Sequence, residues 1–170
     1  VEDGMMERFG IDEVYGMHNV PGRALGTFAI RPGAFYAAAD QFVINITGRS
    51  GHAAQPHQTI DSTLVGSHVV IALQAIASRE VDPVKQVVVS VTTFETSSKA
   101  HNVVAGSARL TGTVRTFDEG VRDQVEQRLK EIASGIAASF GATAGVEFER
   151  GYPVLINADQ ETEFAAEAAR

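Results

Sequence analysis

The sequence predicts an α+β sandwich in which a four-stranded antiparallel sheet carries two helices on one face. Two patterns support this prediction. Four segments of alternating or β-branched residues are typical of strands, and two longer segments repeat apolar residues every three or four positions, as amphipathic helices do. Between about residues 40 and 152 the segments follow the order strand, helix, strand, strand, helix, strand. The fold class follows from this order of elements.

The first strand and the first helix are predicted by their apolar spacing. Residues 40–49 are apolar at alternate positions, namely Phe42, Ile44 and Ile46. Residues 60–79 carry apolar side chains at helical spacing, among them Ile60, Leu64, Ile71 and Ile76. Thr59 or Asp61 could cap the start of this helix, because both side chains can accept a hydrogen bond from a free backbone N–H.

The remaining elements complete the pattern. Residues 85–96 and 107–117 read as strands, and the second places Leu110, Gly112, Val114 and Thr116 on one face. Residues 118–141 form a long helical pattern, with Asp118 at the N-cap position and Gly141 just past the end. Its apolar positions are Val121, Val125, Leu129, Ile132, Ile136 and Phe140. After a last strand at 143–154, the whole is a ferredoxin-like β-α-β-β-α-β arrangement.

The segments on either side of this domain look like pieces of another, incomplete domain. Residues 1–9 are a helical remnant, residues 12–20 a short extended run before a Pro-Gly turn, and residues 26–39 a mixture of turns and short strands. Residues 163–170 are an alanine-rich amphipathic stretch with no capping signal after it. We therefore expect the chain to be a fragment of a longer protein.

Composition excludes several classes of function. The 170 residues carry a formal net charge of −7, whereas nucleic-acid binding usually shows a basic stripe. The absence of cysteine rules out disulfides and thiolate metal sites within these residues. We find no apolar run of membrane-spanning length and no signal peptide, and so expect a cytoplasmic protein that binds neither nucleic acid nor membrane.

Three of the five histidines lie where chemistry is plausible, and each also has a simpler interpretation. His18 stands between an apolar run and a Pro-Gly turn, where it could ligate a metal or merely tuck under a loop. His52 and His57 flank a small-residue turn stiffened by Pro56. An imidazole here could donate a hydrogen bond to a developing oxyanion, or simply decorate a loop that precedes a helix.

The other polar candidates are weaker. His68 is expected to be a partly buried helix residue satisfied by its neighbours, and His101 a surface residue at a strand start. Asn102 could bind a carboxylate or an amide through its side chain, although most loop asparagines form turns. Arg109 and Arg115 could bind carboxylates, although exposed strand arginines usually face solvent. The sequence contains no nucleophile elbow, phosphate-binding loop or H-E-x-x-H motif.

Four separated motifs resemble the M20 metallopeptidase family. They are YGMHNVPG at 15–22, GRSGHAAQPHQTIDS at 48–62, SREVDPV at 78–84 and AHNVVAGSARLTGTVRTF at 100–117. The branch they resemble most is that of the amidohydrolases, including hippurate hydrolase and N-acyl-amino-acid amidohydrolases. The resemblance implies that residues 40–152 are the lid, or dimerisation, domain. Residues 1–39 and 153–170 would then be edges of the catalytic domain.

The same resemblance implies roles for four residues. His18 matches the family's metal-ligating histidine, and His52 matches the lid histidine that stabilises the oxyanion, typically in the active site of the partner subunit. Asn102 matches an asparagine near the bound substrate, and His57 a less uniform position that would also lie near substrate. Ala105 departs from the family pattern, which has proline there.

The implied function is that of part of a metal-dependent amidohydrolase that cleaves N-acyl or N-aroyl amino acids. The full-length enzyme would hold two divalent metal ions, zinc or manganese, and would form a homodimer through the lid. The other metal ligands and the general-base glutamate are absent from this chain, so we expect the fragment to bind no metal and to be inactive alone. Three alternatives remain: a di- or exopeptidase of the same family, a dimerisation or binding module with no catalytic role, and, more distantly, a regulatory ferredoxin-like domain that binds free amino acids.

Overall fold

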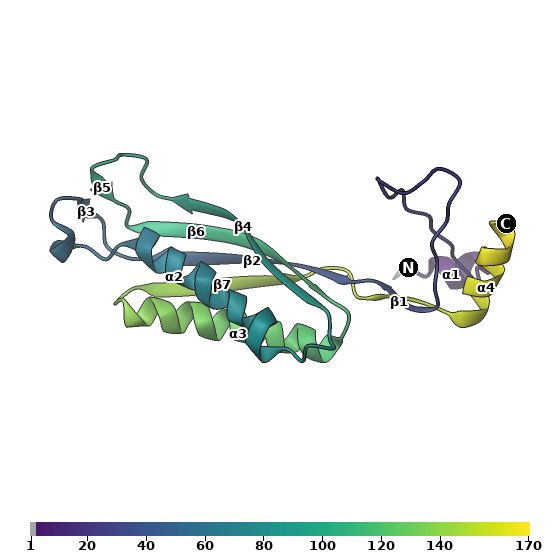
Figure 1. Ribbon diagram of the computed structural model, residues 1–170. Coiled ribbons are helices and arrows are strands. Elements are labelled where there is room, and N and C mark those ends of the chain that lie inside the picture. The colour runs from purple at the N-terminus through teal and green to yellow at the C-terminus, as the bar shows by residue number, and fades with distance from the viewer. Residues whose placement is uncertain (1–2) are drawn as a thin grey trace. The chain divides into compact units, whose positions relative to one another are not determined.

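The computed structural model describes residues 3–170, and the chain divides into two compact units (Figure 1). We call Tyr36–Leu155 the sandwich unit, and the remainder, Val1–Phe35 with Ile156–Arg170, the flanking unit. The predicted domain at 40–152 falls within the sandwich unit.

The sandwich unit is built on a four-stranded antiparallel sheet. Its strands are β2 (Ala38–Thr47), β4 (Val87–Thr96), β6 (Ser107–Thr116) and β7 (Thr143–Arg150), in the spatial order β4-β6-β2-β7. Two helices, α2 (Ser62–Ala75) and α3 (Glu119–Ser139), cover one face of this sheet (Figure 1). Numbered along the domain, the strand order is 2-3-1-4. The predicted ferredoxin-like arrangement is therefore confirmed.

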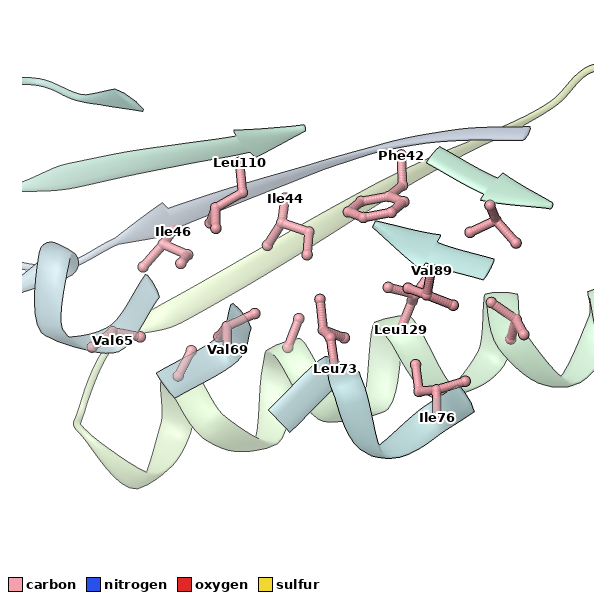
Figure 2. Close-up of a cluster of buried hydrophobic side chains, with 14 of the residues drawn as sticks. Phe42, Ile44, Ile46, Val65, Val69, Leu73, Ile76, Val89, Leu110 and Leu129 are labelled. Atoms are coloured by element: carbon pink, nitrogen blue, oxygen red, sulfur yellow. The ribbon is translucent and has the colours of Figure 1, made fainter. Parts of the chain in front are cut away.

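The core lies between the sheet and the two helices, as Figure 2 shows. The alternation predicted for the first strand is real, because every second side chain of β2 is buried while the others are partly or fully exposed. Helix residues such as Leu73 and Leu129 meet these side chains from the other layer and are fully buried. The largest buried side chains are Phe42, Ile44, Ile46, Leu73, Ile76, Leu110 and Leu129. Burial of this apolar surface is the main force holding the unit together.

Both helices start where the sequence places a cap. Asp61 accepts hydrogen bonds from the backbone N–H groups of Thr63 and Leu64 at 2.8 and 3.3 Å, so Asp61 rather than Thr59 caps α2. Asp118 accepts from the N–H of Val121 at 2.9 Å and caps α3. Helix α2 continues into a π-helical turn, η2, at Ile76–Glu80, and α3 is followed by Gly141 with φ +73°.

Two short strands extend the sandwich unit beyond one end of the sheet. They are β3 (Gly51–His52) and β5 (Val103–Val104), which pair with each other, and a 3₁₀ turn, η1 (Pro56–Gln58), follows β3. We call residues 48–60 and 97–107 the tip. The tip continues from the end of β2 and leads into the start of β6, so it lies at the opposite end of the sheet from Tyr36 and Leu155, which we call the base.

The flanking unit contains little regular structure. Its helices are α1 (Met5–Phe9) and α4 (Asp159–Ala168), and β1 (Gly33–Tyr36) pairs with β8 (Leu155–Asn157) at the boundary with the sandwich unit. The predicted extended run at 12–20 is wrong as a strand. Residues 11–20 form neither helix nor strand and are mostly exposed, because no neighbouring strand offers them a ladder of hydrogen bonds. Residues 1 and 2 of the predicted N-terminal helix lie outside the described residues.

Across residues 3–170, none of the helices combines the length and the hydrophobicity that a membrane span requires.

Candidate functional site at the tip

The tip holds His52 in a short, tightly tied turn. His52 pairs with Val103 across the β3–β5 ladder, and the carbonyl of Asn102 accepts a hydrogen bond from the N–H of Ala53 at 2.9 Å. Gly51 is required by space, since a Cβ there would lie 2.6 Å from Cγ2 of Thr59. The backbone on either side of His52 is therefore fixed by contacts from both segments of the tip.

The imidazole of His52 has a defined hydrogen-bonding state. The backbone N–H of Ala54 donates to its Nδ1 at 3.1 Å. Because Nδ1 accepts this bond, a neutral ring must carry its proton on Nε2. The side chain is exposed, so Nε2–H can be donated to a molecule outside the sandwich unit. An exposed, oriented N–H donor is what an oxyanion-stabilising histidine needs.

Side chains beneath the turn anchor the tip to the rest of the sandwich unit. The buried hydroxyl of Ser62, at the start of α2, donates to the carbonyl of Ala105 at 2.8 Å. The hydroxyl of Ser50 donates to the carbonyl of Val104 at 2.9 Å, and Arg49 and Ile60 exchange two backbone hydrogen bonds. Sequence reasoning missed the two serines, because a hydroxyl that ties one loop to another leaves no spacing signal.

Asn102 and His57 share the tip with His52 but differ in their surroundings. The backbone carbonyl of Asn102 holds the His52 turn through its hydrogen bond from Ala53, and Asn102 itself is exposed. His57 lies in η1, where the Nε2 of its ring is 3.4 Å from the amide nitrogen of Gln58. An amide nitrogen donates, so Nε2 of His57 is an acceptor, the opposite of Nε2 in His52.

The charge of the tip differs from that of the chain. The tip contains Arg49, Lys99 and three histidines, and no aspartate or glutamate, although the chain as a whole carries a net charge of −7. A positive surface on an acidic protein attracts anionic small molecules and raises their local concentration.

His18 belongs to the flanking unit and has the opposite tautomer. Its Nδ1 lies 2.6 Å from the carbonyl oxygen of Asn19. A carbonyl oxygen only accepts, so Nδ1 carries the proton and the lone pair lies on Nε2. A histidine fixed in this way by a carbonyl is the usual form of a metal ligand. Within residues 3–170, no three histidine, aspartate or glutamate residues are grouped so that they could hold a metal ion.

The two remaining histidines and the two strand arginines named as weaker candidates lie outside the His52 turn. His68 is exposed and stacks on Phe140 with ring centroids 4.8 Å apart, so the expectation that it is partly buried is wrong. His101 lies in an exposed turn, as expected. Arg115 donates to the backbone carbonyls of Asp40 and Val114 and to the hydroxyl of Thr113. Arg109 is exposed on the strand.

One edge of the sheet and the adjoining helix carry exposed apolar side chains. Strand β4 is an edge strand with one charged residue, Glu95, in its ten positions. Along β4, Val88 is 49% exposed, and on α2 Leu64 and Ile71 are 48% and 70% exposed. The exposed positions of α2 include no aspartate, glutamate, lysine or arginine, and two of them, Leu64 and Ile71, are apolar. A long, nearly uncharged edge strand beside such a helix is a surface suited to pairing with another chain.

The fold and the tip define a class of protein module, the peptidase dimerisation domain, and the model of this domain family matches residues 37–140. The chain therefore belongs to the M20 peptidase family. It is 44% identical to an N-acyl-L-amino acid amidohydrolase from Geobacillus stearothermophilus over 160 residues, or 94% of the chain and 42% of that protein. It is 34% identical to hippurate hydrolase from Campylobacter jejuni over 170 residues, all of the chain and 44% of that protein.

A solved structure agrees with these relatives. A dinuclear metal-binding peptidase of the M20 family from Bacillus subtilis matches with a TM-score of 0.69 and 29% identity, covering 98% of this chain and 42% of that one. The chain thus spans about two fifths of the length of the relatives it matches.

Proposed function

We propose that this chain supplies the lid and adjoining catalytic-domain segments of a dimeric, metal-dependent amidohydrolase that cleaves N-acyl or N-aroyl amino acids. The observation that carries the proposal is the state of His52, an exposed imidazole whose Nδ1 is occupied by the N–H of Ala54. Nε2–H is then aimed outward as a donor. In the transition state it would stabilise the negative charge that develops on the carbonyl oxygen of the scissile amide.

The position of the tip supports action on a second copy of the protein. Strand β2 has ten residues and separates the base from the tip by about 33 Å. When two β4 edges pair antiparallel across a twofold axis, the tip of one copy comes to lie beside the base of the other. Dimerisation through β4 and α2 would therefore carry His52 toward the catalytic domain of the partner.

The proposed substrate class is supported by the positive charge of the tip and by the substrates for which two related proteins are named. The tip offers fixed positive charge from Arg49 and Lys99, and Asn102 presents an exposed amide close to the His52 turn. Both suit the carboxylate of an acylated amino acid. The Geobacillus relative is named for N-acyl amino acids, and the Campylobacter relative for hippurate.

One residue of the chain, His18, is suited to bind one of the two metal ions that such an enzyme needs. When bound, two divalent metal ions polarise the scissile carbonyl and activate water. His18, with its proton on Nδ1 and its lone pair on Nε2, has the form of a ligand, and the remaining ligands would come from parts of the longer protein outside these 170 residues. We propose that the flanking unit, which contains His18, belongs to that catalytic domain, for which the sequence predicts residues 1–39 and 153–170; residues 36–39 and 153–155 lie in the sandwich unit.

The test is a substitution at His52 in the full-length protein. His52→Ala should lower kcat by about 100- to 1,000-fold on an N-acyl amino acid, with KM little changed, because the donor acts on charge that develops only in the transition state. His101→Ala, a neighbouring tip histidine, is the matched control and should change kcat less than about threefold. Equal effects of the two variants, or unchanged turnover in an intact His52→Ala dimer, would favour a lid that only dimerises.

A substrate panel separates the remaining alternative. An N-acyl amino acid and a dipeptide of the same amino acid differ in the free amine of the dipeptide. Faster turnover of the dipeptide would identify a di- or exopeptidase of the same family.

A further inference from the structure

A buried ion pair at the base of the sandwich unit joins the two strands by which the chain enters and leaves it. Asp40 lies near the start of β2 and is fully buried, and Arg122 of α3 is 5% exposed. The guanidinium of Arg122 donates from Nε to Oδ2 of Asp40 at 2.9 Å and from Nη2 to Oδ1 at 2.5 Å. The carboxylate also accepts from the backbone N–H of Gly151 at 3.0 Å. Gly151 directly follows β7, so this one carboxylate touches both connecting strands.

Further hydrogen bonds tie the start of β2 to the segment that follows β7. Arg122 donates to the carbonyl of Gly151 at 3.3 Å, and the N–H of Ala39 donates to the carbonyl of Tyr152 at 3.0 Å. A Cβ on Gly151 would lie 2.2 Å from the carbonyl oxygen of Ala39, so the two strands leave no room for a side chain at this position. Hydrogen bonding to Asp40 raises the pKa of Arg122, which keeps the guanidinium charged at any relevant pH.

Regular pairing is interrupted immediately beyond this ion pair. On one strand Ala37 alone separates β1 from β2, and on the other the four residues Gly151–Val154 separate β7 from β8. Pro153 lies in that second gap and has no N–H to contribute to a ladder. The chain passes between its two units at 35–36 and at 155–156, so these gaps lie next to both crossings.

A buried ion pair is poorly explained as a source of stability. The loss of hydration of two charges offsets much of their attraction, and an apolar pair of similar volume often stabilises a fold as well. What an apolar pair cannot do is hold two backbones in one register through directed hydrogen bonds. The geometry of Asp40 and Arg122 does this, because their six hydrogen bonds to one another and to Gly151 and Glu119 have defined directions.

We propose that Asp40 and Arg122 are positioning residues that hold the two connecting strands together at the base, so that the lid can turn only at the gaps beyond them. The pair would thereby confine lid motion to Ala37 and Pro153–Val154 and keep the delivery of His52 reproducible. This role rests on the proposed function, in which His52 must reach a reaction centre built elsewhere. Neither residue touches substrate in this proposal.

The test combines a structural and a kinetic measurement on the full-length protein. Spin labels are attached to cysteines introduced at exposed positions, Glu167→Cys on α4 and Ala138→Cys on α3, since this chain has no cysteine of its own. Any cysteine outside these residues is first replaced. Arg122→Lys keeps the charge but loses the two-pronged contact with Asp40 and the reach to Gly151. We expect it to at least double the width of the distance distribution measured by pulsed electron spin resonance.

The matched control is Arg128→Lys. Arg128 lies on the same helix and makes a similar two-pronged contact with Glu80, at 2.7 and 3.0 Å, but touches neither connecting strand. The proposal predicts that Arg128→Lys leaves the distance distribution unchanged. It also predicts that kcat/KM falls about 10- to 100-fold in Arg122→Lys only, because the tip that carries His52 is misplaced relative to the reaction centre.

A second variant guards against loss of the fold. Asp40→Asn combined with Arg122→Gln removes both charges, leaves no buried ion unpaired, and should broaden the distribution in the same way. Distributions for Arg122→Lys and for the double variant that match the control would overturn the proposal. If the wild-type protein lacks amidohydrolase activity, the proposed function fails, whereas the distance distributions still decide whether the ion pair limits lid motion.

Discussion

The same substitution at two glycines is expected to change stability in opposite directions. Gly112 lies in β6 at the centre of the sheet, where a Cβ would stand 2.1 Å from Cζ of Phe42 and 2.3 Å from the carbonyl oxygen of Ser90. Gly135 lies on the exposed side of α3, where a Cβ would meet nothing within 4 Å. Gly112→Ala therefore overfills the core, and Gly135→Ala only restricts the unfolded chain.

The size of each effect follows from these distances. Carbon atoms pack at about 3.5–4.0 Å, so the new methyl group would overlap the ring of Phe42 by about 1.4 Å or more. Phe42 is 1% exposed and has no room to move, and the carbonyl of Ser90 belongs to β4, so that strand must shift as well. We expect Gly112→Ala to cost about 3 kcal/mol. Gly135→Ala should stabilise the helix by about 0.5–1 kcal/mol.

The assay is urea unfolding followed by circular dichroism. With a slope of about 1–3 kcal/mol per molar, the midpoint of Gly112→Ala should fall by about 1–3 M, whereas that of Gly135→Ala should rise slightly. Because β4 is also the proposed dimer edge, Gly112→Ala should weaken self-association too. A Gly112→Ala protein as stable as Gly135→Ala would refute this account of the packing between β2, β4 and β6.

Three further outcomes are expected. The pKa of Glu126 is lowered by a hydrogen bond from Lys130, so its stabilising contribution is present above its ordinary value of 4.5 and is lost as the pH falls through the folded-state value. Glu126→Gln should therefore be less stable than the parent at pH 7, and thermal melts of the two should converge in acid. In sedimentation velocity, Ile71→Glu should shift the protein toward monomer, whereas Val84→Glu, at an even more exposed apolar position in a loop, should not; identical profiles would place the interface elsewhere. In the full-length protein, His18→Ala should lower the metal bound per subunit in elemental analysis, and an unchanged content would remove His18 from the ligand set.

The order of strands and helices was predictable because each element repeats its own period. Alternation in β2 and the three- and four-residue spacing in α3 both depend on burial of one face, and burial leaves a pattern in the sequence. The cap of α3 was predictable for a similar reason, since Asp118 precedes the first apolar position. The extended run at 12–20 failed because its apolar residues belong to an exposed segment without a partner strand.

The details of the tip could not be predicted from spacing. The hydrogen bond that sets the tautomer of His52 comes from the backbone of Ala54, and any residue except proline has that N–H. The register between β3 and β5, and the serine that ties Ala105 to α2, join segments about 40 to 50 residues apart. Likewise, the contact of Asp40 with Arg122 and Gly151 spans 82 and 111 positions. Long-range polar contacts of this kind have no periodicity for a single sequence to reveal.

That the proton of His52 is set by a main-chain amide has an evolutionary consequence. Most substitutions at position 54 would keep the donor, because every residue except proline has a backbone N–H. The side chains of the tip could therefore diverge between relatives while the protonation of this imidazole stayed the same, held by a peptide bond that mutation cannot easily remove.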